Sequence, residues 1–286
     1  MNRSLTQGTE EWKTLRSTKV GASDASAILG VSKWTTPYQL WEQKLGLREV
    51  ETTSSMRRGT ELEEEARREF EHLHGISVFP DVVFHPEYDW MMASLDGLSL
   101  DGKILVEIKN VNKQDHQVAL DGNVPLHYIP QCQHQLAVTG LDSMYYFSYN
   151  ADNPAIIEVK RDDAYIAGMI EKEKEFYRCM TEFDPPPLTD RDYVEHTDQE
   201  WCALAFELKH TSANIKVFEQ REKDLRNQLI NLSEGKNCKG AGIKMTRIVR
   251  KGNIDYAKVE ALQGIDLEPY RKPPIESWRI GECDAL

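Results

Sequence analysis

The sequence predicts an α/β fold in which helices flank a central mixed sheet, followed by a C-terminal extension. Residues 56–74 place apolar side chains every three or four positions, the period of an amphipathic helix. Short β-rich runs bounded by proline, aspartate and glycine follow between 76 and 111. Three consecutive prolines at 185–187 then interrupt the pattern. We therefore expect a core domain over residues 1–188 and an extension over 189–286.

Helical and β-type signals succeed one another along the core domain. The first 50 residues carry helix signals, among them a Ser-Asp pair before an apolar run and a proline at position 37. The helix at 56–74 carries a stripe of four apolar side chains, Leu62, Ala66, Phe70 and Leu73. The β-rich runs are ISVFPDVVF, WMMASLDGLSL, KILVEIKNV, MYYFSYN and IIEVK. Further helices are expected at 130–140 and 162–183.

The extension carries a heptad seam. Its side chains recur at alternating steps of three and four residues from Leu204 to Leu232, with two polar interruptions, which predicts a long helix. This helix either packs against its own core or forms an intermolecular coiled coil, and the short, impure seam favours the first alternative. A hairpin of IKMTRIVR and IDYAKV around residues 251–253 is expected to follow.

Composition favours a soluble protein of the cytoplasm without a membrane partner. The chain is 40% hydrophobic, holds no apolar run long enough to span a bilayer, and begins without a secretory signal pattern. Its five cysteines are scattered without a CxxC pair, which argues against structural zinc and iron–sulfur clusters. A net charge of −12 argues weakly against nucleic acid as a partner, although a nuclease needs only a local basic groove.

The segment SLDGLSLDGKILVEIKN, residues 94–110, is the most informative in the chain. Asp101-Gly102 is a strong signal for a two-residue hairpin loop. The resulting register places Asp96 opposite Glu107, with the two Cβ atoms roughly 5 Å apart. Lys109 follows Glu107 by two residues and therefore projects from the same face of its strand. Three ionisable side chains are thus expected to converge within an apolar stretch.

This convergence predicts a divalent metal site. Two carboxylates so close together repel each other unless a cation lies between them. Carboxylate, water, carbonyl and phosphate oxygens suit magnesium, with manganese as a substitute. Lys109 would orient the attacking water or stabilise charge in the transition state of phosphodiester hydrolysis. A simpler alternative is a salt-bridged pair, Glu107 with Lys109, on a solvated sheet face.

Neighbouring motifs favour the metal site, because four sequence blocks in order resemble the lambda exonuclease and YqaJ-like viral recombinase family of PD-(D/E)XK nucleases. The resemblance extends over roughly residues 8 to 185. The blocks are Trp12-Lys13-Thr14-Leu15-Arg16 with Val20-Gly21-Ala22-Ser23-Asp24, Gly59-Thr60-Glu61-Leu62-Glu63, Ser94-Leu95-Asp96-Gly97 with Glu107-Ile108-Lys109, and Gln131-Cys132-Gln133-His134-Gln135-Leu136. One departure is the Ser-Leu-Asp of the third block, where the family often has Ser-Pro-Asp.

The resemblance implies a PD-(D/E)XK restriction-endonuclease-like core and a role for each residue of the third block. Asp96 and Glu107 would be metal ligands, and the carbonyl of Ile108 would complete the site. Lys109 would be the catalytic lysine. Glu63, on the charged helix, would be the outer acidic residue that serves a second metal ion or its water.

The remaining blocks imply a glutamine and a phosphate pocket. Gln133 would reach the metal centre. Arg16, Ser23 and Ser94 would bind a 5′-terminal phosphate, since an arginine fork and two hydroxyl donors suit a phosphate dianion. Taken alone, Ser23 is equally typical of a helix cap.

The function implied by the resemblance is a magnesium-dependent 5′-to-3′ exonuclease that acts on linear double-stranded DNA ends. It would leave 3′ overhangs for phage-type recombination with a single-strand annealing protein, as a possible homotrimer in the cytoplasm of a bacterial host. One alternative is a RecB-like or CRISPR-adaptation nuclease, although such relatives typically carry a histidine where Glu63 stands and the latter an iron–sulfur cysteine set. Another is a non-catalytic DNA-end-binding module, against which the intact Asp96, Glu107 and Lys109 argue.

Overall fold

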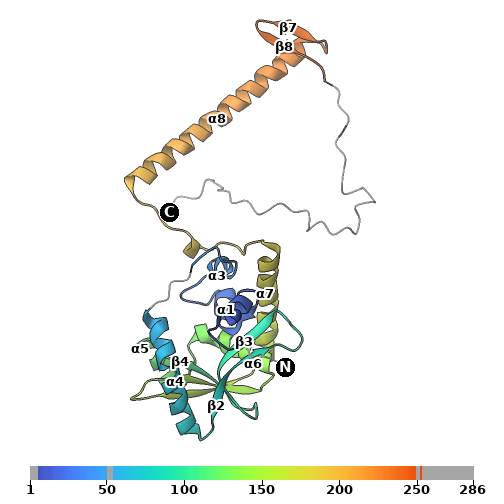
Figure 1. Cartoon of the computed structure of the whole chain (residues 1–286). Coiled ribbons are helices and arrows are strands. Elements are labelled where there is room, and N and C mark those ends of the chain that lie inside the picture. The colour runs from blue at the N-terminus through green and yellow to red at the C-terminus, as the bar shows by residue number, and fades with distance from the viewer. Residues whose placement is uncertain (1–5, 50–53, 249–251, 253–286) are drawn as a thin grey trace. The chain divides into compact units, whose positions relative to one another are not determined.

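A computed structural model describes residues 6–49, 54–248 and 252 of the chain. The chain divides into two compact units, Met1–Val194 and Glu195–Leu286 (Figure 1). The division falls beyond residue 188, the boundary expected from the triple proline. Residues just after the prolines belong to the first unit because Arg191 donates hydrogen bonds to the carbonyl oxygens of Ser32 and Lys33, at 2.8 and 3.0 Å.

A six-stranded mixed sheet forms the centre of the first unit. Its strands are β1 (Val20–Gly21), β2 (Val78–Phe84), β3 (Met91–Ser99), β4 (Leu105–Lys109), β5 (Ser143–Ser148) and β6 (Ala155–Lys160). The strand order is β1-β3-β4-β5-β6, and β2 pairs with β3 off this path. Strand β3 is parallel to β1, and β4 is parallel to β5, whereas the other pairs are antiparallel. The mixed sheet expected from the sequence is therefore confirmed.

Helices cover the sheet (Figure 1). The α-helices are α1 (Glu10–Ser17), α2 (Ala25–Ile28), α3 (Pro37–Lys44), α4 (Ser54–His74), α5 (Lys113–Leu120), α6 (Ile129–Thr139) and α7 (Asp163–Glu182). Three short 3-10 helices accompany them, η1 (Ala22–Asp24), η2 (Leu126–Tyr128) and η3 (Asp190–Asp192). Pro37 opens α3 as expected, because its fixed φ suits the first helical position and Thr36 caps the helix before it.

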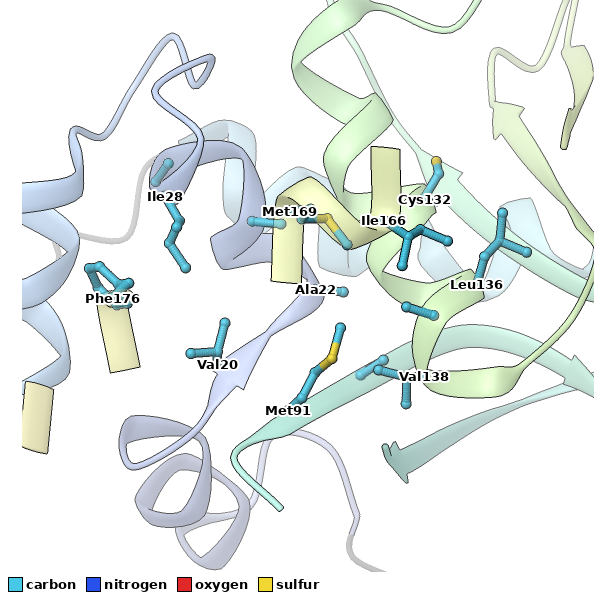
Figure 2. Close-up of a cluster of buried hydrophobic side chains, with 14 of the residues drawn as sticks. Val20, Ala22, Ile28, Met91, Cys132, Leu136, Val138, Ile166, Met169 and Phe176 are labelled. Atoms are coloured by element: carbon cyan, nitrogen blue, oxygen red, sulfur yellow. The ribbon is translucent and has the colours of Figure 1, made fainter. Parts of the chain in front are cut away.

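The sheet is buried on both faces. The larger core packs side chains of β1 and β3 against α2, α6 and α7, and Figure 2 shows Met91 and Val20 among the residues that meet there. The second core packs Ala66 and Phe70 of α4 against β4 and β5. These two positions confirm half of the predicted helical stripe, whereas Leu73 is 50% exposed near the end of the helix. Alternate residues of β4 consequently enter different cores.

The second unit contains the predicted long helix, α8 (Gln199–Leu232), of which no described residue is buried. Strands β7 (Cys238–Gly240) and β8 (Ile243–Met245) form a hairpin after it. The prediction paired residues 243–250 with 254–259 instead, and the second of these segments lies outside the described residues. The observed hairpin forms because Ala241 and Gly242 both adopt positive φ, as a type I′ turn requires. Within the described part of the chain, no helix combines the length and apolarity needed to cross a membrane.

Candidate active site

Strands β3 and β4 form the predicted hairpin in the predicted register, with Leu98 opposite Leu105. The loop is longer than expected, because the backbone N–H of Ser99 donates to the carbonyl oxygen of Ile104 at 2.9 Å. The hydroxyl of Ser99 also accepts the backbone N–H groups of Lys103 and Ile104. Four residues, 100–103, therefore close the turn. The register is unchanged because the longer loop is centred on the same two residues.

A bulge in β3 lies at the site itself. Phe79 of β2 pairs with Leu98, but Asp81 pairs with Leu95, so β3 holds one extra residue between these pairs. Gly97 lies in this interval, where a Cβ atom would come within 2.6 Å of Val78 Cγ2. Only glycine fits between the neighbouring strands at that distance. The bulge interrupts the alternation of side chains along β3 just where the predicted metal ligand stands.

The carboxylate of Asp96 takes the place of a backbone partner beyond this bulge. Its Oδ2 accepts the backbone N–H of Ile108 at 2.8 Å, one residue past Glu107. The paired ladder between β3 and β4 ends at Gly97 and Val106. Asp96 is thus fixed against β4 by its side chain, next to the position that the hairpin register assigns to it.

Glu107 is the most enclosed member of the site, with a side chain that is 1% exposed. Its Oε1 lies 2.5 Å from Lys109 Nζ and accepts a hydrogen bond from Gln131 Nε2 at 2.5 Å. Its other oxygen accepts from the side-chain amide of Gln135. Helix α6 therefore presents two glutamines, four residues apart on one helical face, to a single buried carboxylate.

Gln133, the glutamine assigned to the site from the resemblance, lies elsewhere. Its Nε2 donates to the carbonyl oxygen of Lys160 at 2.8 Å, and its Oε1 accepts the backbone N–H of Asp162 at 2.9 Å. Position 133 is two residues from both 131 and 135, which turns it about 200° away on the helix. The assignment is corrected to Gln131 and Gln135, which the one-turn spacing Gln-x-x-x-Gln on a predicted helix would have indicated.

The charges of the site perturb one another. Burial and the nearby Glu107 carboxylate raise the pKa of Asp96 to about 8, and Glu63 adds to the effect. Burial alone would disfavour a charged Lys109, but the carboxylates of Glu107 and Asp96 outweigh it and raise the pKa of the lysine above its usual value. The lysine is therefore an ammonium ion, whereas Asp96 holds its proton to unusually high pH in the metal-free protein.

Helix α4 joins the site through an arginine that the sequence reasoning missed. Arg67 donates from Nε to the carbonyl oxygen of Asp96 at 2.9 Å and from Nη2 to Glu63 Oε1 at 2.7 Å. Arg67 thus links the Glu63 carboxylate with the backbone of β3 at Asp96. The i, i+4 spacing of Glu63 and Arg67 on a charged helix was visible in the sequence, but it is typical of any solvated helix face.

These residues fit a hard divalent cation. No group of three His, Cys, Asp or Glu side chains within the described residues is arranged to hold an ion unaided. An ion at Asp96 and Glu107 would therefore take its remaining oxygens from the Ile108 carbonyl, water or substrate, as magnesium commonly does. Burial and the Glu107 carboxylate raise the pKa of Asp96 despite the nearby Lys109 ammonium, and a divalent cation would favour the charged carboxylate.

The residues expected to bind phosphate lie together around Trp12 of α1. Arg16 donates from Nη2 to Ser23 Oγ at 2.7 Å, and its guanidinium lies 5.4 Å from the centre of the Trp12 ring. The indole N–H of Trp12 donates to Ser94 Oγ at 3.0 Å. Ser23 therefore uses its hydroxyl on the arginine rather than as a helix cap. Trp12 thus contacts both Arg16 and Ser94, and Arg16 in turn contacts Ser23, so the three residues expected to bind phosphate form one connected group.

A buried aspartate lies next to Arg16 and Ser23. Asp24 accepts from Arg16 at 3.3 Å and from the backbone N–H of Gly21 at 2.9 Å, and it pairs with Lys44 Nζ at 2.5 Å. Burial opposes the charged form, yet Lys44 and Arg16 hold the pKa of Asp24 below its usual range. Two cations thus surround one carboxylate, which leaves net positive charge beside the predicted phosphate position.

The mixed sheet, its flanking helices and the hairpin with Asp96, Glu107 and Lys109 define a nuclease fold of the PD-(D/E)XK class. Residues 11–142 match the YqaJ-like viral recombinase domain. The chain belongs to the YqaJ-like viral recombinase family.

Individual relatives support this membership. The protein YqaJ of Bacillus subtilis is 33% identical over 175 residues, which are 59% of this chain. The match spans 55% of that relative, about half of its length. The crystal structure of an alkaline exonuclease from Laribacter hongkongensis, LHK-Exo, has 31% identity and a TM-score of 0.53, over 61% of this chain and 94% of that one. The structure of LHK-Exo in complex with dAMP matches at 30% identity, with the same TM-score and the same coverage of each chain.

Proposed function

We propose that the protein is a magnesium-dependent exonuclease that degrades one strand of linear duplex DNA from a 5′-phosphorylated end. The observation that carries the proposal is the meeting of Asp96, Glu107 and Lys109 on one hairpin. The similarity to LHK-Exo, an alkaline exonuclease crystallised with dAMP, supports a DNA substrate.

The arrangement of β3 supports attack at a chain end. Ser94, which belongs to the proposed phosphate pocket, stands two residues before Asp96 on this strand. Two residues of a strand span about 7 Å, comparable to the spacing of neighbouring phosphates along one DNA strand. A terminal phosphate held by Arg16 and Ser94 would therefore place the next phosphate near Asp96. This geometry favours release of one nucleotide at a time in the 5′-to-3′ direction.

The protonated Lys109 stabilises negative charge and does not act as a general base. Its raised pKa keeps the ammonium form across the physiological range, so it has no lone pair with which to remove a proton from water. Its three N–H groups can instead stabilise the negative charge that develops on the phosphate. A divalent cation bound at Asp96 and Glu107 would supply Lewis acidity toward phosphoryl oxygens and would lower the pKa of a coordinated water. Gln131 and Gln135 hold the Glu107 carboxylate in place for that ion.

The proposed partner protein is inferred from the DNA product of the reaction. Removal of 5′ nucleotides leaves a 3′ single strand, which a single-strand annealing protein would use in phage-type recombination within a bacterial cytoplasm. A homotrimeric ring around DNA would reconcile processive digestion with a net charge of −12, provided that the ring lines its channel with basic residues. Light scattering tests the trimer directly, and a monomer at working concentration would remove it from the proposal.

The function is tested with linear duplex labelled at either the 5′ or the 3′ end, together with a covalently closed circle. In magnesium, we expect the 5′ label to be released at once as a mononucleotide, the 3′ label to remain on a single strand, and the circle to survive. EDTA should stop all digestion. Release of the 3′ label first would reverse the polarity. Binding of ends without digestion would instead support the non-catalytic end-binding module.

A further inference from the structure

A short loop between α2 and α3 holds an indole in solvent. The Trp34 side chain is 60% exposed, although its loop is firmly hydrogen-bonded. The Ser32 hydroxyl accepts the backbone N–H groups of Trp34 and Thr35, both at 3.2 Å. Arg191 donates hydrogen bonds to the carbonyl oxygens of Ser32 and Lys33 in the same loop. The exposure of Trp34 is therefore imposed by a fixed backbone.

A row of rings connects this indole with the catalytic lysine. Lys109 Nζ lies 5.4 Å from the centre of the Tyr128 ring, and that ring lies 6.2 Å from the Trp34 ring. His127 meets the indole edge to face, with ring centres 5.1 Å apart. Trp34 is thus two ring contacts away from the ammonium that is proposed to act on the scissile phosphate.

The buried carboxylate of Asp115 lies between the Trp34 loop and His127. Asp115 pairs with Lys33 Nζ at 2.9 Å and lies 3.5 Å from His127 Nε2. Asn112 donates a further hydrogen bond to it at 2.8 Å. Lys33, the residue before Trp34, is therefore paired with a buried carboxylate that also lies close to His127, the ring in contact with the indole.

We propose that Trp34 is a stacking platform for a nucleobase of the DNA strand held at Lys109. The inference rests on the proposed nuclease function and adds a base-binding subsite to it. A fixed, exposed indole that is separated from the Lys109 ammonium by one tyrosine ring matches the combination of aromatic and cationic groups that binds single strands. Stacking suits an enzyme that must accept every sequence, because each base offers a flat face.

Binding is measured by anisotropy on labelled 5′-phosphorylated duplex whose terminal linkages are phosphorothioates, so that hydrolysis does not interfere. Trp34→Ala should weaken binding about 5- to 160-fold, and Trp34→Phe should restore most of the affinity. Trp201→Ala is the matched control, because Trp201 is 55% exposed but belongs to the second unit. It should leave affinity unchanged. Melting temperatures equal to wild type show that each variant folds.

An abasic nucleotide moved along the first four positions of the 5′ strand locates the base. One position should weaken wild-type binding as much as Trp34→Ala does, and the variant should lose no further affinity at that position. Wild-type affinity in Trp34→Ala, or equal abasic losses in both proteins, would overturn the platform. If the platform is overturned in this way but wild type still digests linear DNA, the nuclease proposal is unaffected. If wild type neither binds nor digests DNA ends, both the platform and the nuclease proposal are overturned.

Discussion

Asp96→Asn should make the stability of the metal-free protein much less sensitive to pH. The folded state raises the pKa of Asp96 from 3.8 to about 8. As the pH rises through this interval, the unfolded chain loses the proton while the folded chain keeps it, so stability falls. The contribution is fully present below pH 4 and is lost by about pH 8. Asparagine carries no such proton, yet its side-chain oxygen can still accept the N–H of Ile108.

The size of the effect follows from the same values. Each pKa unit corresponds to about 1.4 kcal/mol, so the interval from pH 5 to pH 8 sets an upper bound of roughly 4 kcal/mol. At about 2 to 4 °C per kcal/mol for a domain of this size, this bound corresponds to a loss of about 8 to 16 °C in the melting temperature of wild type relative to Asp96→Asn. The comparison starts at pH 5, because other carboxylates titrate below it.

Differential scanning calorimetry in EDTA, at half-unit steps from pH 5 to pH 9, measures this difference. Millimolar magnesium should then raise the melting temperature of wild type at pH 8, because the ion binds only the folded state, and should raise that of the variant far less. Calcium should act like magnesium in this assay but fail to support digestion, since its looser coordination positions water poorly. Parallel pH profiles of the two proteins in EDTA would refute the reasoning.

Five other substitutions test the remaining contacts. Lys109→Ala should abolish digestion while end binding stays measurable, because the ammonium serves the transition state, and near wild-type cleavage would contradict this. Arg16→Ala should slow digestion of 5′-phosphorylated duplex much more than of 5′-hydroxyl duplex, and equal slowing would make the arginine structural. Gln131→Ala should lower the digestion rate by about 10-fold or more, whereas Gln133→Ala should lower only the melting temperature, and the reverse order would restore the original assignment. Asp24→Asn should lower the unfolding free energy by about 3 kcal/mol or more in urea titrations, because it leaves a buried ammonium unpaired, and an unchanged midpoint would argue against that ion pair.

Local sequence signals predicted much of the hairpin that carries Asp96 and Glu107. The Asp-Gly turn at 101–102 set the register of β3 against β4 even though the loop proved longer, because both loops share one centre. The period of α4 likewise predicted the burial of Ala66 and Phe70. Such signals depend on neighbours within a few residues, which one sequence displays directly.

Contacts between distant segments were not predictable in the same way. The bulge at Gly97 depends on how β2 pairs with β3, about 18 residues away along the chain. Gln131 and Gln133 differ only in helical phase, and the count of residues in the motif selected the wrong one. Asp115 brings Lys33 and His127 close together, although no sequence periodicity connects the three segments.

The bulge at Gly97 has a consequence for engineering the hairpin and for recognising distant members of the family. Insertions between residues 100 and 103 would lengthen an exposed turn, and loop length costs little free energy. A single deletion at the bulge would instead shift the strand by one residue and exchange its inward and outward side chains. Alignments of remote homologues should therefore place gaps between the glycine and the second carboxylate, and never between the first carboxylate and the glycine.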